Sequence, residues 1–450
     1  MRSEPGAFRG GKRDPEREKC SGTDRGARGI DRDAGREKRK GGRTEAAEKV
    51  NRFLGLSEAD RRKITQRIGL TEKDLFASVK RATFLEDWPS EREEVLRNRF
   101  RILERSPEER LTGGGIGPFP IPAVVDAMAS RSEFVTAYTP YQPEVSQGTL
   151  EVIFEFQTRV CDMTGLEISN AGLYDGSTAV AEAISMAAAV TKRREVLLAR
   201  TVSPRIREVV RTLLAGRGFH FREVSFDRES GILKEVGDEA TPSEETACLV
   251  IQSPNAFGLF ESRGREWFAA AREVGAVPIQ IFHPLAVFVS EKPASSGAAI
   301  AVAEGQPLGI PLSGGGPFLG MIAAEERFLR RMPGRIVGET VDANGRRALV
   351  LTLQAREQHI RRERATSNIC SNQALMALRA TLFCAALEWE GITDFARRLS
   401  DLANDKARAE AIFPGRVFNE YAVKGNRGLP LDYPELGAIS VVGVGTECDE

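Results

Sequence analysis

The sequence predicts an α/β fold built around a doubly wound sheet of parallel strands. Three short apolar runs, residues 196–199, 249–252 and 277–282, have the length and continuous hydrophobicity of strands that are buried on both faces. Each run is followed by a turn and then by apolar residues at helical spacing, as in residues 263–274. This alternation of strand, loop and helix is typical of a sheet covered by helices on both faces.

The composition along the chain suggests four parts. Residues 1–48 are dominated by charged residues and glycine, so we expect a disordered charged tail that cannot bury enough apolar surface to offset its ordering entropy. Its mixed charge signs favour a solvated segment over a nucleic-acid-binding arm. Residues 49–112 are expected to form an N-terminal helical region, and residues 113–347 the large α/β domain. We expect C-terminal helices and a small α+β subdomain over residues 348–450.

Two helices are predicted at the start of this C-terminal part. Residues 348–364 read as one long Arg-rich helix, and residues 372–388 as a second helix dense in Ala and Leu. The small subdomain is expected over residues 417–444.

The bulk composition argues against several function classes. The 450 residues carry 64 Lys+Arg and 64 Asp+Glu, and this zero formal charge gives no reason to expect a nucleic-acid or membrane-surface partner. No apolar run approaches the ~20 residues of a membrane-spanning helix. The six cysteines are scattered without a CxxC pair, which favours free thiols in a reducing, cytoplasmic setting over disulfides or zinc. Only three histidines are present, so a His-rich metal site or a Ser-His-Asp hydrolase is poorly supported.

One loop stands out as a candidate site. Residues 138–148 read YTPYQPEVSQG, and the two prolines fix φ and favour extended geometry in the residues before them. We expect a stiff loop that holds hydroxyl, carboxamide and carboxylate groups in fixed directions. Its candidate active-site or interface residues are Tyr138, Tyr141, Gln142, Glu144 and Gln147. The alternative is a structural loop whose tyrosines are simply buried.

Four motifs carry a family resemblance. They are TLEVIFEFQTRVCDMT at 149–164, NAGLYDGSTAVAEA at 170–183, EGQPLGIPLSGGGPFLG at 304–320 and LQAREQHIRRERATSNICSNQA at 353–374. Together they resemble the glycine decarboxylase family, the P-protein of the glycine cleavage system. Within that family they look like the first (alpha) subunit of the two-chain form, over residues 56–437.

The resemblance implies an aspartate-aminotransferase-like large domain of the type I pyridoxal-phosphate enzymes. Such a site needs a helix N-terminus for the phosphate, a carboxylate for the pyridinium nitrogen and a lysine for the Schiff base. Gly176, Ser177 and Thr178 are the candidate phosphate loop, and an ordinary N-cap is the alternative. His283 stands where the aspartate is expected. Gln306 stands five residues before Pro311, where the partner subunit of the family has its lysine.

We therefore expect no covalent cofactor in this chain, because a carboxamide cannot form an imine. The nearest lysine, Lys292, falls in a polar loop. The resemblance implies a lysine-bearing beta subunit that carries pyridoxal phosphate, an α2β2 assembly, glycine as substrate, and transfer of the aminomethyl group to the lipoyl arm of H-protein.

Three arginines, Arg361, Arg362 and Arg364, are candidates for that interface. The alternative is a solvent-facing helix side paired with Glu357 and Glu363.

The chain also departs from the family. Phe119 and Pro120 stand where relatives usually have a histidine and a tyrosine, and the C-terminal region is shorter than usual. These changes, with His283, leave open a diverged pseudoenzyme or scaffold. A self-sufficient pyridoxal-phosphate enzyme is the third hypothesis, and Gln306 argues against it.

Overall fold

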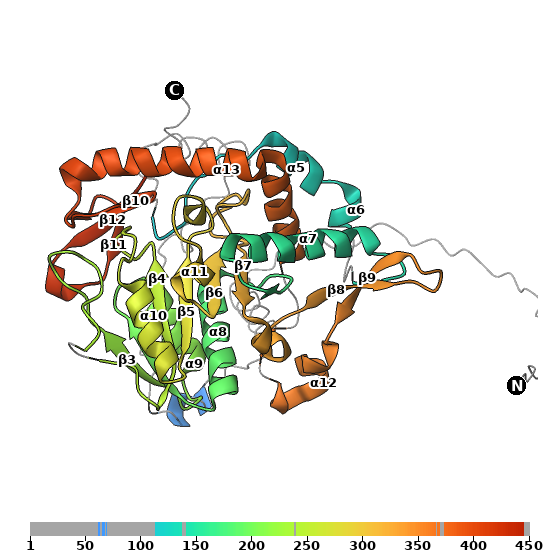
Figure 1. Cartoon of the computed structure of the whole chain (residues 1–450), viewed down its shortest axis with the longest axis horizontal. Helices are drawn as coiled ribbons and strands as arrows, with labels where there is room; N and C mark the ends of the chain where they lie inside the picture. The colour runs from blue at the N-terminus through green and yellow to red at the C-terminus, as the bar shows by residue number, and fades with distance from the viewer. Residues whose placement is uncertain are drawn as a thin grey trace, which may run out of the picture. The chain divides into compact units, whose positions relative to one another are not determined.

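The computed structural model describes residues 62–63, 65–67, 69, 113–136, 141–237, 240–365, 367–369 and 373–444 (Figure 1). The chain divides into two compact units, residues 1–102 and residues 103–450. In the first unit, helical backbone is described at residues 62–63 and 65–67. The expected tail over 1–48 and nearly all of the expected helical region over 49–112 lie outside the described residues.

The second unit is organised around a seven-stranded sheet with the order β1-β7-β6-β5-β4-β2-β3. Strands β3, β2, β4, β5 and β6 run parallel to one another, whereas β7 is antiparallel to both β6 and β1. The three predicted strands are confirmed as β2, β4 and β5. The strands are β1 (Ile168–Ser169), β2 (Glu195–Ala199), β3 (His220–Val224), β4 (Thr246–Ser253), β5 (Val277–Phe282), β6 (Ile300–Glu304) and β7 (Gly320–Ala324).

Successive residues of β6 face two different core clusters, as the pleat of a strand requires. Ile300 and Val302 are buried in the cluster that contains α8 (Gly176–Thr191). Ala301 and Ala303 are buried in the cluster that contains α7 (Gln147–Thr164) and α13 (Ala374–Glu410). The sheet is therefore covered on both faces, which explains why its strands are apolar throughout rather than alternating.

Further elements complete the unit. They are α5 (Ala123–Ala129), α6 (Ser132–Val135), α9 (Pro204–Leu214), α10 (Gly264–Glu273), η3 (Ala286–Phe288), α11 (Pro293–Ser296), η4 (Glu326–Arg331), η5 (Gln354–Arg356), α12 (Gln358–Arg361), η6 (Arg362–Arg364) and η7 (Pro434–Leu436). Among the described helices, none is both long and apolar enough to cross a bilayer. In the same part of the chain, no group of His, Cys, Asp and Glu is arranged to hold a metal ion.

The C-terminal part contains a long helix and a small sheet. Helix α13 is interrupted at Glu388, whose backbone has φ 56° and ψ 173°. Its first segment corresponds to the helix predicted over 372–388, of which Asn372 lies outside the described residues. The strands β10 (Glu420–Lys424), β12 (Ile439–Gly443) and β11 (Leu429–Leu431) then pair antiparallel in that order.

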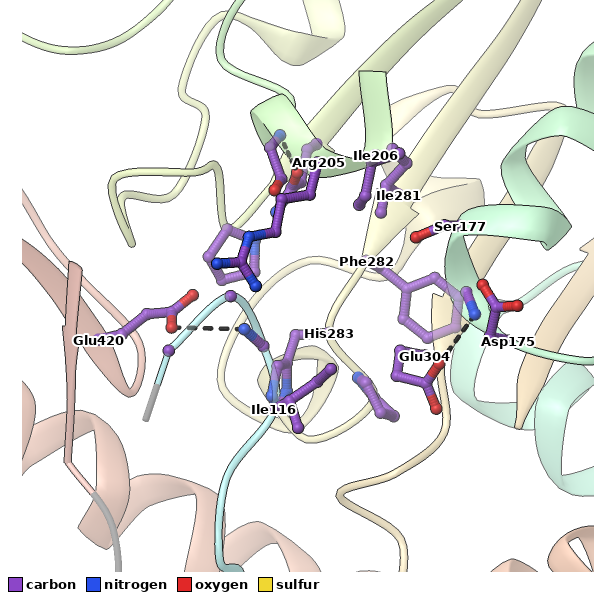
Figure 2. A pocket seen from close by; sticks show the side chains of 18 of the residues that line it. Ile116, Asp175, Ser177, Arg205, Ile206, Ile281, Phe282, His283, Glu304 and Glu420 are labelled. Atoms are coloured by element: carbon purple, nitrogen blue, oxygen red, sulfur yellow. Dashed lines mark hydrogen bonds between the residues drawn. The ribbon is translucent and has the colours of Figure 1, made fainter. Parts of the chain in front are cut away.

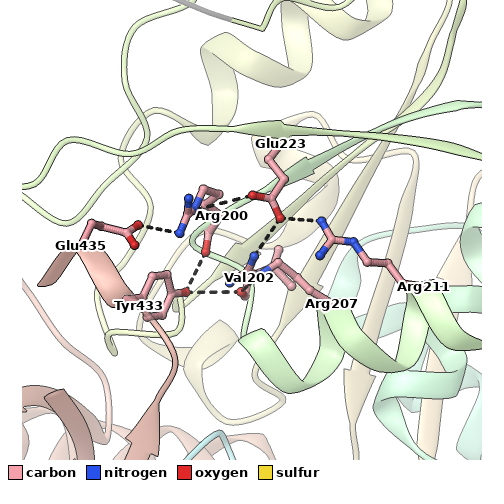
Figure 3. A network of polar contacts seen from close by, with 7 residues as sticks. All are labelled: Arg200, Val202, Arg207, Arg211, Glu223, Tyr433 and Glu435. Carbon is pink, nitrogen blue, oxygen red and sulfur yellow. Dashed lines mark hydrogen bonds and ion pairs between the residues drawn. The ribbon is translucent and has the colours of Figure 1, made fainter. Parts of the chain in front are cut away.

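A polar network fixes this small sheet beside the large one (Figure 3). The Tyr433 hydroxyl donates to the carbonyl of Arg200 at 2.7 Å, and the Arg200 guanidinium pairs with Glu435 at 2.6 Å. Arg207 and Arg211 of α9 both bind Glu223 of β3, at 2.9 and 2.6 Å. The network joins the segment between β11 and β12 to the end of β2, and β3 to α9.

The predicted long helix over 348–364 is wrong. Residues Arg347–Thr352 form strand β9, which pairs antiparallel with β8 (Ile336–Val341). Leu353 then adopts a left-handed backbone (φ 54°), and only the short elements η5, α12 and η6 follow. Pairing with β8 and contact with α7 override a local sequence that favours helix, as tertiary context often does.

Two glutamines of α7 bind the two strands of this hairpin through paired hydrogen bonds. The Gln157 amide donates to the Val337 carbonyl and accepts from the Val337 N–H, both at 2.9 Å. The Gln147 amide makes the same pair of bonds with Leu349, again at 2.9 Å. Gln157 is buried, whereas Gln147 belongs to the exposed end of the helix.

Replacing Gln157 by alanine should lower the free energy of unfolding by about 2–4 kcal/mol, because the buried N–H and C=O of Val337 lose their partners. Gln147→Ala should have a smaller effect, since water can replace its amide. Urea unfolding measures the stability, and hydrogen exchange at Val337 and Leu349 localises the change. If both variants had equal and negligible effects on stability, the paired hydrogen bonds of Gln157 and Gln147 would not stabilise the hairpin.

Candidate functional site

A cavity of about 270 Å³ opens at the carboxyl ends of β4, β5 and β6 (Figure 2). This is the edge at which open α/β sheets usually bind ligands. Its walls come from the connector before α5, the start of α8, the start of α9 and the start of β10. The polar residues that matter for its chemistry are Asp175, Ser177, Arg205, His283, Glu304 and Glu420, and the apolar walls include Ile116, Ile206, Ile281 and Phe282.

Glu304, the last residue of β6, occupies the N-terminus of α8. Its Oε2 accepts the N–H of Gly176 at 2.8 Å, and its Oε1 accepts the N–H groups of Gln306 and Leu319, both at 3.0 Å. A Cβ at residue 176 would lie 2.9 Å from the Glu304 nitrogen, so glycine is required for this approach. Burial raises the pKa of Glu304 to about 7, although the three N–H donors oppose that shift.

Asp175 closes the same helix end. Its carboxylate accepts the N–H of Thr178 at 2.9 Å, and the Thr178 hydroxyl accepts the N–H of Asp175 at 3.3 Å, which together form a capping box. The predicted phosphate loop over Gly176, Ser177 and Thr178 is therefore an N-cap whose free N–H groups are largely bound by the chain's own carboxylates.

His283 follows β5 and is buried beside the cavity. Its Nδ1 accepts the N–H of Leu285 at 3.2 Å, so the ring proton of the neutral form resides on Nε2. That Nε2 atom is buried and makes no hydrogen bond with any residue that the structure describes. Burial lowers the pKa of His283 to about 3, and the aromatic rings of Phe119 and Phe418 lie 6.0 and 4.9 Å from the imidazole.

Gln306 is buried, and its amide is bound by backbone groups. Its Nε2 donates to the carbonyls of Gly117 at 2.9 Å and Ile310 at 2.8 Å, and its Oε1 accepts the Gly117 N–H at 3.1 Å. These bonds hold the connector against the loop between β6 and β7. Lys292 donates to the Asp162 carbonyl at 2.7 Å and does not line the cavity.

These residues do not fit a covalently bound pyridoxal phosphate. The phosphate position at α8 faces the carboxyl groups of Glu304 and Asp175, which repel an anion. The residue after β5 is a neutral imidazole in place of a carboxylate. Gln306 has no amine to form an imine, and its amide is committed to the backbone.

The described part of the predicted loop, residues 141–148, does not line this cavity. Tyr138 lies outside the described residues. The ring of Tyr141 lies under the Arg335 guanidinium, at 4.1 Å from its Cζ to the ring centroid. Gln142 and Glu144 are exposed, and Gln147 binds β9. The described part of the loop thus lies against the β8–β9 hairpin rather than among the residues that line the cavity.

The three predicted arginines lie on a separate exposed segment. Arg361, Arg362 and Arg364 are all exposed, and Arg364 approaches Glu363 at 3.9 Å. Arg362 lines a second cavity, of about 450 Å³, together with Glu182 and Arg217. Burial raises the pKa of Glu182 in that cavity.

Sequence reasoning missed Glu304, Glu420 and Arg205 as cavity residues. A charged residue at the end of the apolar run 298–303 was a usable signal for Glu304. Glu420 had no comparable signal, because the Gly115 N–H that it accepts, at 3.3 Å, is 305 residues away in the sequence.

Curated relatives of this chain are subunits of one enzyme. Residues 51–422 match the family described as "Glycine cleavage system P-protein". A probable glycine dehydrogenase (decarboxylating) subunit 1 of Geobacillus kaustophilus is 40% identical over 429 residues, covering 88% of this chain and 95% of the relative. The protein of the same name from Citrifermentans bemidjiense is 48% identical over 327 residues, covering 71% and 72%.

Solved structures agree with the predicted fold. A glycine decarboxylase (P-protein) of the glycine cleavage system, in inhibitor-bound form, has a TM-score of 0.72 at 36% identity and covers 88% of this chain and 95% of its own. An aspartate aminotransferase from Thermus thermophilus has a TM-score of 0.50 at 14% identity, covering 73% and 92%. This second likeness concerns the fold alone, and the prediction of an aspartate-aminotransferase-like domain is confirmed.

Glu420 should make stability depend on pH. Burial raises its pKa to about 7, so the folded protein holds this proton more tightly than the unfolded chain does. Its contribution to the free energy of unfolding is complete below the ordinary Glu pKa of 4.5 and is lost as pH rises from there through about 7. Glu420→Gln cannot ionise, so the loss of stability between about pH 5.5 and pH 8 should shrink by about 1–3 kcal/mol.

Urea unfolding at the two pH values measures this difference. Glu229→Gln, an exposed position, serves as the matched control and should leave the pH dependence unchanged. An unchanged dependence in Glu420→Gln would show that the carboxyl group is already ionised in the folded protein at low pH.

Proposed function

Because this chain belongs to the glycine cleavage system P-protein family, we propose that it is the subunit of glycine dehydrogenase (decarboxylating) that lacks the Schiff-base lysine. The observation that carries this proposal is Gln306. It stands five residues before Pro311, where the family resemblance leads us to expect the lysine, and its buried amide is bound by backbone groups within an aminotransferase-like sheet. A chain of this kind contributes structure and surface to an enzyme whose cofactor chemistry takes place on another subunit.

The proposed partner is a second subunit that bears the lysine and holds pyridoxal phosphate, in an α2β2 assembly. When bound there, the cofactor supplies the electron sink for loss of carbon dioxide from glycine. The aminomethyl group then passes to the lipoyl arm of H-protein. We place this activity in the cytoplasm, in keeping with the scattered free thiols such as Cys161, Cys248 and Cys384.

Two surfaces support contact with that partner. The segment that carries Arg361, Arg362 and Arg364 also exposes Ile360, whose relative exposure is 52%. The loop that carries Tyr141, Gln142 and Glu144 exposes Val145, at 78%. Exposed apolar side chains surrounded by arginine and tyrosine are typical of protein interfaces. Gln147 anchors this loop to β9, which holds its groups in a fixed orientation.

Reconstitution with the lysine-bearing subunit tests the function. The chain alone, with pyridoxal phosphate and glycine, should give no imine absorption band and no exchange of carbon dioxide with glycine, and Lys292→Ala should change neither. The mixture with the partner and lipoylated H-protein should catalyse the exchange. If the chain associates stably with the partner but the mixture catalyses no carbon dioxide exchange, the chain is a scaffold without turnover. An imine absorption band that the chain gives alone and that depends on Lys292 would overturn the argument from Gln306.

Charge reversal tests the proposed interface. The double variant Arg361→Glu with Arg364→Glu should weaken association with the partner roughly tenfold or more, since like charges at an interface cost several kcal/mol. Arg228→Glu, another exposed arginine, is the matched control and should associate normally. Size-exclusion chromatography with light scattering measures the assembly. If the double variant associates with the partner as the unchanged chain does, this segment is not part of the interface.

A further inference from the structure

The cavity at the carboxyl edge of the sheet contains polar side chains that have few or no partners among the described residues. The buried Nε2–H of His283 makes no hydrogen bond with a described residue. The guanidinium of Arg205, an exposed residue at the start of α9, makes no hydrogen bond or ion pair with any residue that the structure describes. Glu420 is 5% exposed and has only the long bond of 3.3 Å from Gly115 N–H and a contact with the Gly114 backbone.

These three groups come from separate elements and meet at one place. Arg205 belongs to α9, His283 follows β5, and Glu420 opens β10. Figure 2 shows the Arg205 and Glu420 side chains pointing toward the same part of the cavity, with His283 below them in this view. Tyr433 lies in the segment before β12, the strand that pairs with β10, and its ring contacts Arg207 of α9, which links the small sheet to α9. The site is therefore built by tertiary structure and does not depend on a single mobile side chain.

The charged and polar groups that line the cavity indicate which chemical groups a ligand must carry. A guanidinium and an imidazole N–H are both donors, and together they match the two oxygens of a carboxylate. The Glu420 carboxyl group is an acceptor and, when ionised, matches an ammonium group. A buried polar group without a partner is unfavourable, so a ligand that offers an acceptor to the donors and a donor to the carboxyl group is stabilised here.

Other ligand classes fit less well. Glu304, Asp175 and Glu420 give the cavity more carboxyl groups than its one arginine can balance, which disfavours phosphate and dicarboxylates. The apolar walls at Ile206 and Phe282 disfavour a strongly hydrated cation without an apolar part. The volume of about 270 Å³ lies just below the range of roughly 300–1,000 Å³ of pockets for drug-sized ligands, which indicates a smaller molecule.

We infer that this cavity is a non-covalent binding site for a small zwitterion of amino-acid size, with Arg205 and His283 binding its carboxylate and Glu420 its ammonium group. The site goes beyond the proposed function, because it needs neither pyridoxal phosphate nor the partner subunit. Binding here stabilises the contact of β10 with the connector, since Glu420 also accepts the Gly115 N–H.

Isothermal titration calorimetry on the purified chain alone tests the inference. The probes are glycine, L-alanine and γ-aminobutyrate, which vary the spacing of the two charges, and propionate, ethylamine and inorganic phosphate, which lack one of them. At least one zwitterion should bind, and propionate and ethylamine should each bind about tenfold more weakly or not at all, because each forfeits a charge-assisted hydrogen bond.

Substitutions then locate the binding. Arg205→Gln and Glu420→Gln should each weaken zwitterion binding about tenfold or more, whereas the exposed control Arg228→Gln should not. Arg205 is exposed at the cavity mouth, so its replacement is compatible with folding, and circular dichroism verifies both variants.

Three outcomes would overturn the inference: no binding of any zwitterion, binding that survives both substitutions, or phosphate binding tighter than every zwitterion. Because no partner or turnover enters the measurement, failure here leaves the subunit function intact. Failure of the carbon dioxide exchange likewise leaves this site intact.

Discussion

The contact of the Glu304 carboxylate with the start of α8 determines what this site can hold. Three backbone N–H groups, from Gly176, Gln306 and Leu319, converge on one side chain at 2.8–3.0 Å. A helix N-terminus is a ready anion site, and here the chain supplies the anion itself. The same bonds join the helix, the end of β6 and the loop before β7. Removing the carboxylate would therefore free the anion site and loosen its walls at the same time.

Gln306 extends this arrangement to the connector before α5. A primary amide both donates and accepts, and Gln306 uses both abilities on the backbone of Gly117. A lysine at this position has donors only and leaves the Gly117 N–H without its acceptor. The absence of an imine-forming amine and the docking of the connector are thus two results of one side chain. The docked connector then presents Gly115 to Glu420, which closes one wall of the cavity.

The sequence predicted those parts of the fold whose signals are local. Strands β2, β4 and β5 are buried on both faces, so their continuous apolar runs are visible in isolation. The start of α8 follows from the side chains of Asp175 and Thr178, three residues apart. The sequence of strand β9 predicts a helix, because the strand conformation depends on β8 and on Gln147, about two hundred residues earlier.

The residues of the candidate site likewise include some that a local sequence pattern identifies and others that only the tertiary structure brings together. The positions of Gln306 and His283 were identified from motif spacing, and the structure explains why each is unsuited to the cofactor. The stiff loop is unusual in sequence, yet its described part is hydrogen-bonded to the β8–β9 hairpin and does not line the cavity. Glu420 and Arg205 become neighbours only through the docking of the small sheet, which no local pattern encodes.

The polarity of the cavity is not explained by stability. Glu304 and Glu420 have pKa values raised to about 7 by burial, which means that ionising them in place is unfavourable. Replacing buried charges by well-packed apolar residues is often neutral or stabilising, and the neighbouring Ile206, Ile281 and Phe282 show that apolar packing is possible here. For Glu304 the three N–H donors account for its presence. For His283 Nε2, no group among the described residues does so, and a bound water or ligand in the cavity would supply the acceptor. The Arg205 guanidinium and the Glu420 carboxyl group line the same cavity and favour a ligand with charges of both signs.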